Sequence, residues 1–207
     1  MHTLLSAATL VLACAFAPAL PHLDPPTTVP SAEGDDAGFQ QAVFSAEALQ
    51  ELMADASVMG IRFYNVMAAP GDATGSVMAV GIVMDGSERN PGKSYLMDMG
   101  LRQGQFNGVM VAAANATKYC RNMSAAGHAS YSAAFTRTDI EALLDQEGCT
   151  GLMVTPATVD KGLSMQITAM KMEGERAVAL GSGGAYQRQC GFPCPSVCGP
   201  KKNYVNM

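Results

Sequence analysis

The sequence predicts an α+β protein in which a duplicated helix-plus-hairpin unit forms a mostly antiparallel sheet with helices packed on it. Its 207 residues are 48% apolar and 15% charged, which suits a compact body with a buried core. Two segments, 44–86 and 135–174, repeat one order of signals: a helix cap, an amphipathic helix, a glycine and two β-type runs. We interpret them as divergent copies of one unit inside an ordered domain that spans residues 37–186.

Each unit is expected to begin with a capped helix. Ser45 and Thr136 are predicted N-cap residues, because a hydroxyl there can accept a hydrogen bond from a free N–H of the first turn. Phe44 and Phe135 precede them and are placed to pack on the fourth helical residue as a hydrophobic staple. Apolar residues then recur at helical spacing over about three turns. They are Leu49, Leu52, Met53 and Ala56 in the first copy, and Ile140, Leu143 and Leu144 in the second.

A glycine follows each helix, and a β-type run follows each glycine. Gly60 precedes the run 61–67, and Gly151 precedes the run 152–155. We expect each run to be the first strand of a hairpin.

The two returning strands of these hairpins differ in pattern. The run 77–84 is apolar at every position, which predicts a strand covered on both faces. In the second copy, apolar residues alternate with Ser164, Gln166 and Thr168, which predicts one face in water. We expect the copies to build one continuous sheet; the alternative is a pseudo-symmetric binding groove between them.

The segment between the copies, 109–124, is rich in alanine and predicts a longer connecting helix. Gly127 is its expected stop. Cys120 falls on the apolar stripe of this helix, where we expect a buried and unpaired thiol.

Two motifs resemble those of an uncharacterised bacterial family with two copies of a capped helix, a turn, a hairpin and a short Cys/Pro-rich tail. One is the turn Gln146-Glu147-Gly148-Cys149-Thr150-Gly151, and the other is the tail segment Pro193-Cys194-Pro195-Ser196-Val197-Cys198-Gly199. The resemblance implies the fold and the two-copy layout, but no activity and no functional residue. The chain departs from the family pattern where Ser57-Val58 replaces the Gly-Cys pair in the first copy, and where Met153 replaces an arginine that the first copy keeps as Arg62.

The first 20 residues predict an export signal. The run 4–20 carries no charge and ends in small residues before a proline-rich linker, 21–36. Ala17-Pro18-Ala19 fits signal cleavage, whereas Val11-Leu12-Ala13-Cys14 resembles a lipobox that would place a lipid on Cys14. We therefore expect an extracytoplasmic protein, in the periplasm, in the cell envelope or secreted. Because no Lys or Arg precedes the run, the alternative is a buried helix of the fold in a cytoplasmic protein.

The tail, 187–207, holds three cysteines at a spacing of four residues: Cys190, Cys194 and Cys198. Close cysteines in an oxidising compartment normally pair, so we expect a disulfide among them. The Cys-x-x-Cys pair of a typical zinc site is missing. A thiol or metal-binding protein that uses these cysteines is the alternative.

The sequence contains no recognisable catalytic motif. His2, His22 and His128 form no zinc-binding pattern, and no serine lies in a nucleophile motif. We expect no cofactor. The net charge is −5 and no long basic run is present, so we expect no nucleic-acid partner. Membrane contact is expected only through a lipid on Cys14.

These observations favour a non-catalytic secreted or envelope protein that makes contacts with another protein. An enzyme of unfamiliar type is a further alternative. It would need a pocket on which Arg62, Asp85 or Glu173 converge.

Overall fold

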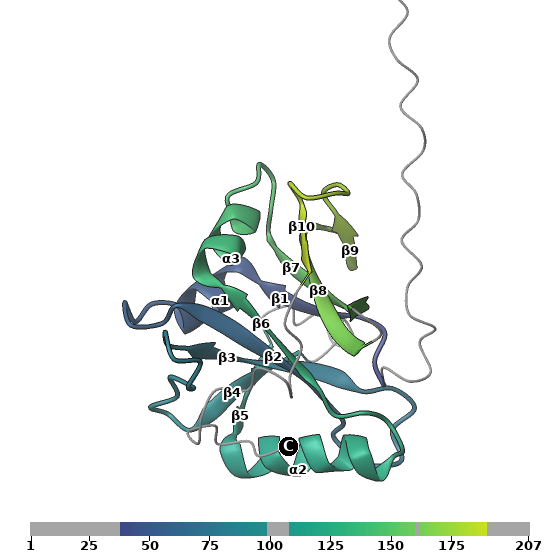
Figure 1. The fold of residues 1–207 in the computed structure, drawn as a ribbon. Helices are drawn as coiled ribbons and strands as arrows, with labels where there is room; N and C mark the ends of the chain where they lie inside the picture. The colour runs from purple at the N-terminus through teal and green to yellow at the C-terminus, as the bar shows by residue number, and fades with distance from the viewer. Residues whose placement is uncertain (1–37, 99–107, 160–161, 190–207) are drawn as a thin grey trace, which may run out of the picture.

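The computed structural model describes residues 38–98, 108–159 and 162–189 (Figure 1). They form two five-stranded sheets, and every strand pair in them is antiparallel. The α+β prediction is confirmed, but the prediction of one continuous sheet is wrong. The segment 1–36 with Cys14, and the tail cysteines Cys190, Cys194 and Cys198, lie outside the described residues.

The first sheet, sheet A, has the order β1-β7-β8-β10, and β9 also pairs with β8. Its strands are β1 (Ala42–Ser45), β7 (Gly151–Val159), β8 (Gly162–Glu173), β9 (Arg176–Ala179) and β10 (Gln187–Gln189).

The second sheet, sheet B, has the order β5-β4-β3-β2-β6. Its strands are β2 (Gly60–Val66), β3 (Ser76–Ile82), β4 (Ser94–Met97), β5 (Val109–Ala112) and β6 (Ser132–Thr136). Three helices complete the described structure: α1 (Ala46–Leu52), α2 (Ala113–Ala125) and α3 (Arg137–Leu144).

Both predicted caps are present. Ser45 Oγ accepts a hydrogen bond from Ala48 N at 3.2 Å, and Thr136 Oγ1 accepts one from Asp139 N at 3.1 Å. The helices are shorter than expected, with 7 residues in α1 and 8 in α3. α1 ends at Leu52, before the turn that leads to β2, and α3 ends at Leu144, before the turn that leads to β7.

A short strand precedes the helix of each unit, and this strand, which we call the first strand of its unit, pairs with a strand of the other unit. β1 pairs with β7, with Ser45 opposite Gly151, and β6 pairs with β2, with Thr136 opposite Gly60. A backbone bond extends each ladder at the same place: Ala46 N donates to Thr150 O at 2.9 Å, and Arg137 N donates to Met59 O at 2.7 Å. Because α1 and α3 each connect the two sheets, neither unit is complete without the other.

The main core lies between the sheets and is closed by α1 and α3. Phe63 stands at its centre, with ring centroids 5.5 Å from Phe44 and 5.9 Å from Phe135. The two phenylalanines predicted to staple the helices are buried in this same core, together with Leu49 and Ile140. Aromatic pairs at such distances add to the stability that the buried area provides.

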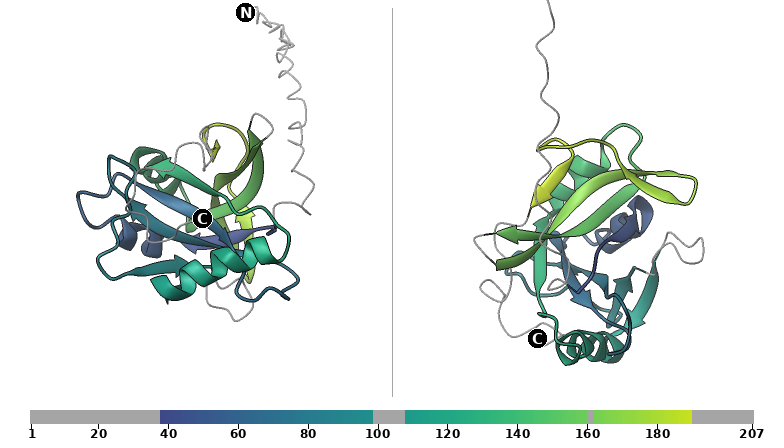
Figure 2. Two further views of the ribbon diagram at one scale, coloured as in Figure 1. Left: turned by 60° about the horizontal axis from the view of Figure 1, so that its bottom comes forward. Right: turned by 90° about the vertical axis from the view of Figure 1, so that its right-hand side faces the viewer.

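The connecting helix α2 covers the outer face of sheet B, as the right-hand view of Figure 2 shows. It begins at Ala113 rather than at Val109, because residues 109–112 pair with β4 as β5. Gly127, at a φ of 88°, follows its end, so the predicted stop is confirmed.

The two returning strands turned out differently. The middle of β3 is buried on both faces, as predicted, but the prediction is wrong at the end of the run, because the strand ends at Ile82 and Met84 is 86% exposed. The prediction that one face of β8 is exposed to water is wrong, because Ser164 and Thr168 are buried and Gln166 is half-buried. Gln166 Nε2 lies 3.4 Å from Thr168 Oγ1, so small hydroxyl side chains on this face are buried with hydrogen-bonding neighbours rather than in water.

The close pairing of β2 and β6 predicts that Gly60→Ala will destabilise the protein by about 2–3 kcal/mol. An added Cβ at this position would strike the backbone carbonyl of Phe135, which cannot turn aside as a side chain can. Gly71, with open space around its Cβ position, is the matched control. Urea unfolding followed by circular dichroism should show a change of less than about 1 kcal/mol for Gly71→Ala. Equal stability of the two variants would contradict the observed packing.

Candidate functional site

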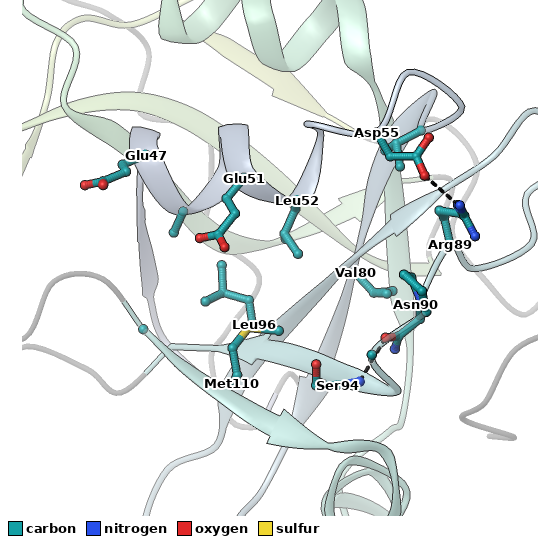
Figure 3. Close-up of a pocket in the computed structure, with 15 residues that line it drawn as sticks. Glu47, Glu51, Leu52, Asp55, Val80, Arg89, Asn90, Ser94, Leu96 and Met110 are labelled. Carbon is teal, nitrogen blue, oxygen red and sulfur yellow. Dashed lines mark hydrogen bonds and ion pairs between the residues drawn. The ribbon is translucent and has the colours of Figure 1, made fainter.

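A cavity of about 400 Å³ opens between α1 and the edge of sheet B (Figure 3). We call it the α1–β5 groove and define it by Glu47, Glu51, Leu52, Leu96 and Met110. Figure 3 shows Glu51 and Leu52 directed from α1 toward Leu96 and Met110 on β4 and β5. One wall is therefore a helix face and the other is a pair of strands.

The helical wall follows directly from the cap of α1. Residues four apart lie on the same face of a helix, so Glu47 and Glu51 line the groove while Leu49 faces the core. On the opposite wall, Leu96 and Met110 are directly paired across β4 and β5 and share a face of the sheet. Met110 remains 54% exposed although it is apolar.

An ion pair closes one end of the groove. Arg89 Nε lies 2.7 Å from Asp55 Oδ2, and the side chain and backbone N–H of Ser57 both donate to Asp55 Oδ1. These bonds from Ser57, followed by Arg89, lower the pKa of Asp55 to about 2. Within the described part of the chain, Glu47 and Glu51 form no ion pair, so the groove carries uncompensated negative charge.

The segment that carries Arg89 is held in place by a buried polar cluster. Glu88 accepts hydrogen bonds from Tyr64 Oη and Tyr95 Oη, each at 2.6 Å. Tyr64 and Tyr95 are buried on the face of sheet B that α2 covers, and their rings pack edge to face with centroids 6.3 Å apart. Burial, together with the Glu88 carboxylate, raises the pKa of both tyrosines, so they remain protonated donors at neutral pH.

The cluster positions two groove residues. Glu88 forms an isolated antiparallel β-bridge with Ile82, and Arg89 N donates to Gly81 O at 2.8 Å. The segment after β3 therefore folds back along that strand. Asn90 follows; its Oδ1 accepts a hydrogen bond from Ser94 N at 2.8 Å, and its amide lies next to the Tyr95 hydroxyl. Asn90 thus joins the polar cluster to the lining of the groove.

A second cavity, of about 350 Å³, lies between α1 and α3, where a groove between the two copies was an alternative. Arg137 lines it and donates to backbone carbonyls at the end of α1: Val58 O at 2.9 Å, Asp55 O at 3.1 Å and Met53 O. These bonds tie the two helices together, so we interpret Arg137 here as structural.

The residues considered for an enzyme do not meet at either cavity. Arg62 is buried in β2, Asp85 lies in an exposed turn where it accepts from Ser87 N, and Glu173 ends β8 in an ion pair with Lys171. None of the three lines the groove or the second cavity. These three residues therefore do not form the shared pocket that the enzyme alternative required.

The two cysteines in the described ranges are free thiols. Cys120 is buried on α2, as expected, and burial raises its pKa to about 12. Cys149 is half-buried, and its Sγ lies 3.2 Å from Gly151 O. In residues 38–98, 108–159 and 162–189, no group of three His, Cys, Asp or Glu side chains is arranged to hold a metal ion.

The groove and the Glu88 cluster were not identified from the sequence. Tyr64 and Tyr95 stand in β-type runs where aromatic residues are expected for packing alone, and Glu88 follows a turn that suggests solvent. The one available signal was the spacing of Glu47 and Glu51, which places two carboxylates on one side of a short helix.

Searches of protein-family models, curated proteins and solved structures find no match to this chain. The resemblance to the two-copy bacterial family therefore stays a prediction. In the part of the chain that the structure describes, none of the helices has the length and apolar character needed to span a bilayer.

The buried cluster predicts that Glu88→Ala will lower the free energy of unfolding by about 2–4 kcal/mol, because two buried hydroxyls lose their acceptor. Glu175 is exposed and makes no described hydrogen bond, so Glu175→Ala should change stability by less than about 0.5 kcal/mol. Chemical denaturation measures both variants. A loss for Glu88→Ala no larger than that of the control would show that the cluster does not stabilise the fold.

Proposed function

We propose that this chain is a non-catalytic, extracytoplasmic protein that binds another protein at the α1–β5 groove. The observation that carries the proposal is the combination of an apolar surface with uncompensated carboxylates at one open cavity. Leu52, Leu96 and Met110 supply the apolar part, and Glu47 and Glu51 supply the charge.

The chemistry of the lining supports binding rather than catalysis. The described lining holds no histidine, cysteine, lysine or tyrosine, and the hydroxyl of Ser94 makes no hydrogen bond to a described carboxylate, so no nucleophile there is hydrogen-bonded to a base. Exposed apolar side chains beside polar ones are typical of protein interaction sites. Met110 is exposed on β5, so the apolar part of the lining is accessible to a partner.

The extracytoplasmic part of the proposal rests on the uncharged run 4–20. The alternative of a thiol or metal-binding protein rests on Cys190, Cys194 and Cys198, and the described residues add nothing to it. We therefore place the binding function at the groove.

A pair of variants on one strand tests the proposal. Met110→Arg puts a long cation into the groove opposite Glu51, whereas Val109→Arg puts the same side chain on the other face of β5. A photo-crosslinking residue at position 110 in the native host should trap a partner that can be purified and rebound. We expect Met110→Arg to weaken that binary complex at least about tenfold and Val109→Arg to leave it nearly unchanged.

Two outcomes would contradict the proposal. One is a trapped partner that binds both arginine variants as tightly as the unmodified chain. The other is the recovery of a stable binary complex whose contacts lie away from β5 and α1.

A further inference from the structure

We infer that the α1–β5 groove takes an extended protein segment in which a lysine or arginine lies on the same face as an aliphatic side chain. The inference rests on the proposed function and adds the chemistry of the partner. It is carried by the separation of charge and apolar surface across the groove, and by the exposed edge strand beside it.

The net charge of the described groove lining is negative. Arg89 compensates Asp55 at 2.7 Å, which leaves Glu47 and Glu51 on the same helix face without a described cationic partner. Two carboxylates four residues apart on a helix repel each other, and a cation placed between them would remove that repulsion. An anionic segment would be repelled, so the groove selects for positive charge.

Most of the apolar surface lies on the wall opposite this charge. Leu52 on α1 faces Leu96 and Met110 on the strands, and Met110 is 54% exposed. An aliphatic side chain that covered this surface would remove apolar area from water. A segment that pairs with the carboxylates and also covers the apolar surface must therefore carry a cation and an aliphatic group close together.

The edge of sheet B favours an extended backbone. β5 is the last strand in the order of the sheet and pairs only with β4 among the described strands. A strand added beside β5 would direct alternate side chains toward the face that holds Leu96 and Met110, so residues i and i+2 of the segment would both reach the groove.

A buried donor lies at the closed end of the groove. Asn90 is 7% exposed, and although its amide lies next to the Tyr95 hydroxyl, its Nδ2 makes no hydrogen bond of good geometry within the described ranges. A backbone carbonyl of an entering segment could accept from it. Such a contact would favour a peptide over a simple organic amine.

The test is an NMR titration of the ¹⁵N-labelled full chain with acetyl-Thr-Leu-Thr-Lys-Thr-Leu-Thr-amide. Its leucines and lysine share one face when the peptide is extended. A peptide with glutamate in place of lysine is the charge control, and hexylamine tests whether a small organic cation is sufficient. We expect shifts at Glu51, Leu96 and Met110, and a dissociation constant at least about fivefold lower for the lysine peptide than for the glutamate peptide.

Charge reversal in the groove should reverse this preference. The double variant Glu47→Lys/Glu51→Lys is expected to bind the glutamate peptide better, and the preference of the unmodified chain should weaken as salt is added. The double variant Glu173→Lys/Glu175→Lys makes the same change in net charge on exposed residues at the end of β8, and should keep the original preference.

Equal binding of the lysine and glutamate peptides, an unchanged preference after charge reversal in the groove, or an absence of shifts would each overturn the inference. So would hexylamine binding as tightly as the lysine peptide, since the site would then recognise small amines. The proposed function is judged separately, by whether the partner trapped at position 110 depends on the groove. The trapped partner could fail to bind Met110→Arg but still bind the charge-reversal variant as tightly as the unmodified chain. That result would support the proposed function and contradict the chemistry inferred for the segment.

Discussion

The exchange of first strands between the two units is the constraint on which the rest of the structure depends. β1 completes the sheet that contains β7, and β6 completes the sheet that contains β2, with Ser45 opposite Gly151 and Thr136 opposite Gly60. The two N-cap residues, Ser45 and Thr136, therefore each lie opposite a glycine that begins a strand. Phe63 lies between the phenylalanines that precede the two caps, so the exchange also brings the core together.

The groove is a consequence of this arrangement. α1 connects β1 in sheet A to β2 in sheet B, and the connection holds the helix beside the edge of sheet B. The opposite end of the groove depends on Glu88, whose bonds to Tyr64 and Tyr95 hold the segment that carries Arg89 and Asn90. Because both walls are fixed by buried contacts, a binding segment would meet a largely preformed site.

The local elements could be predicted from the sequence, whereas their long-range pairing could not. The caps at Ser45 and Thr136 and the stop at Gly127 depend on residues that are close in sequence. The two separate sheets depend on which distant strands pair, and hydrophobic periodicity does not specify a partner. The groove could not be predicted for the same reason: Glu51 and Met110 are distant in sequence and lie near each other only in the folded protein.

Native-state hydrogen exchange tests the central claim most directly, namely that the exchanged strands make the two sheets one cooperative unit. Each sheet contains a strand from the other unit, so the most protected amides of the β1–β7 and β2–β6 ladders should exchange only through global unfolding. The account predicts that both ladders share one opening free energy, equal to that of global unfolding, and one dependence on denaturant. Exchange of one whole ladder at a much lower free energy, while the other stays protected, would contradict it.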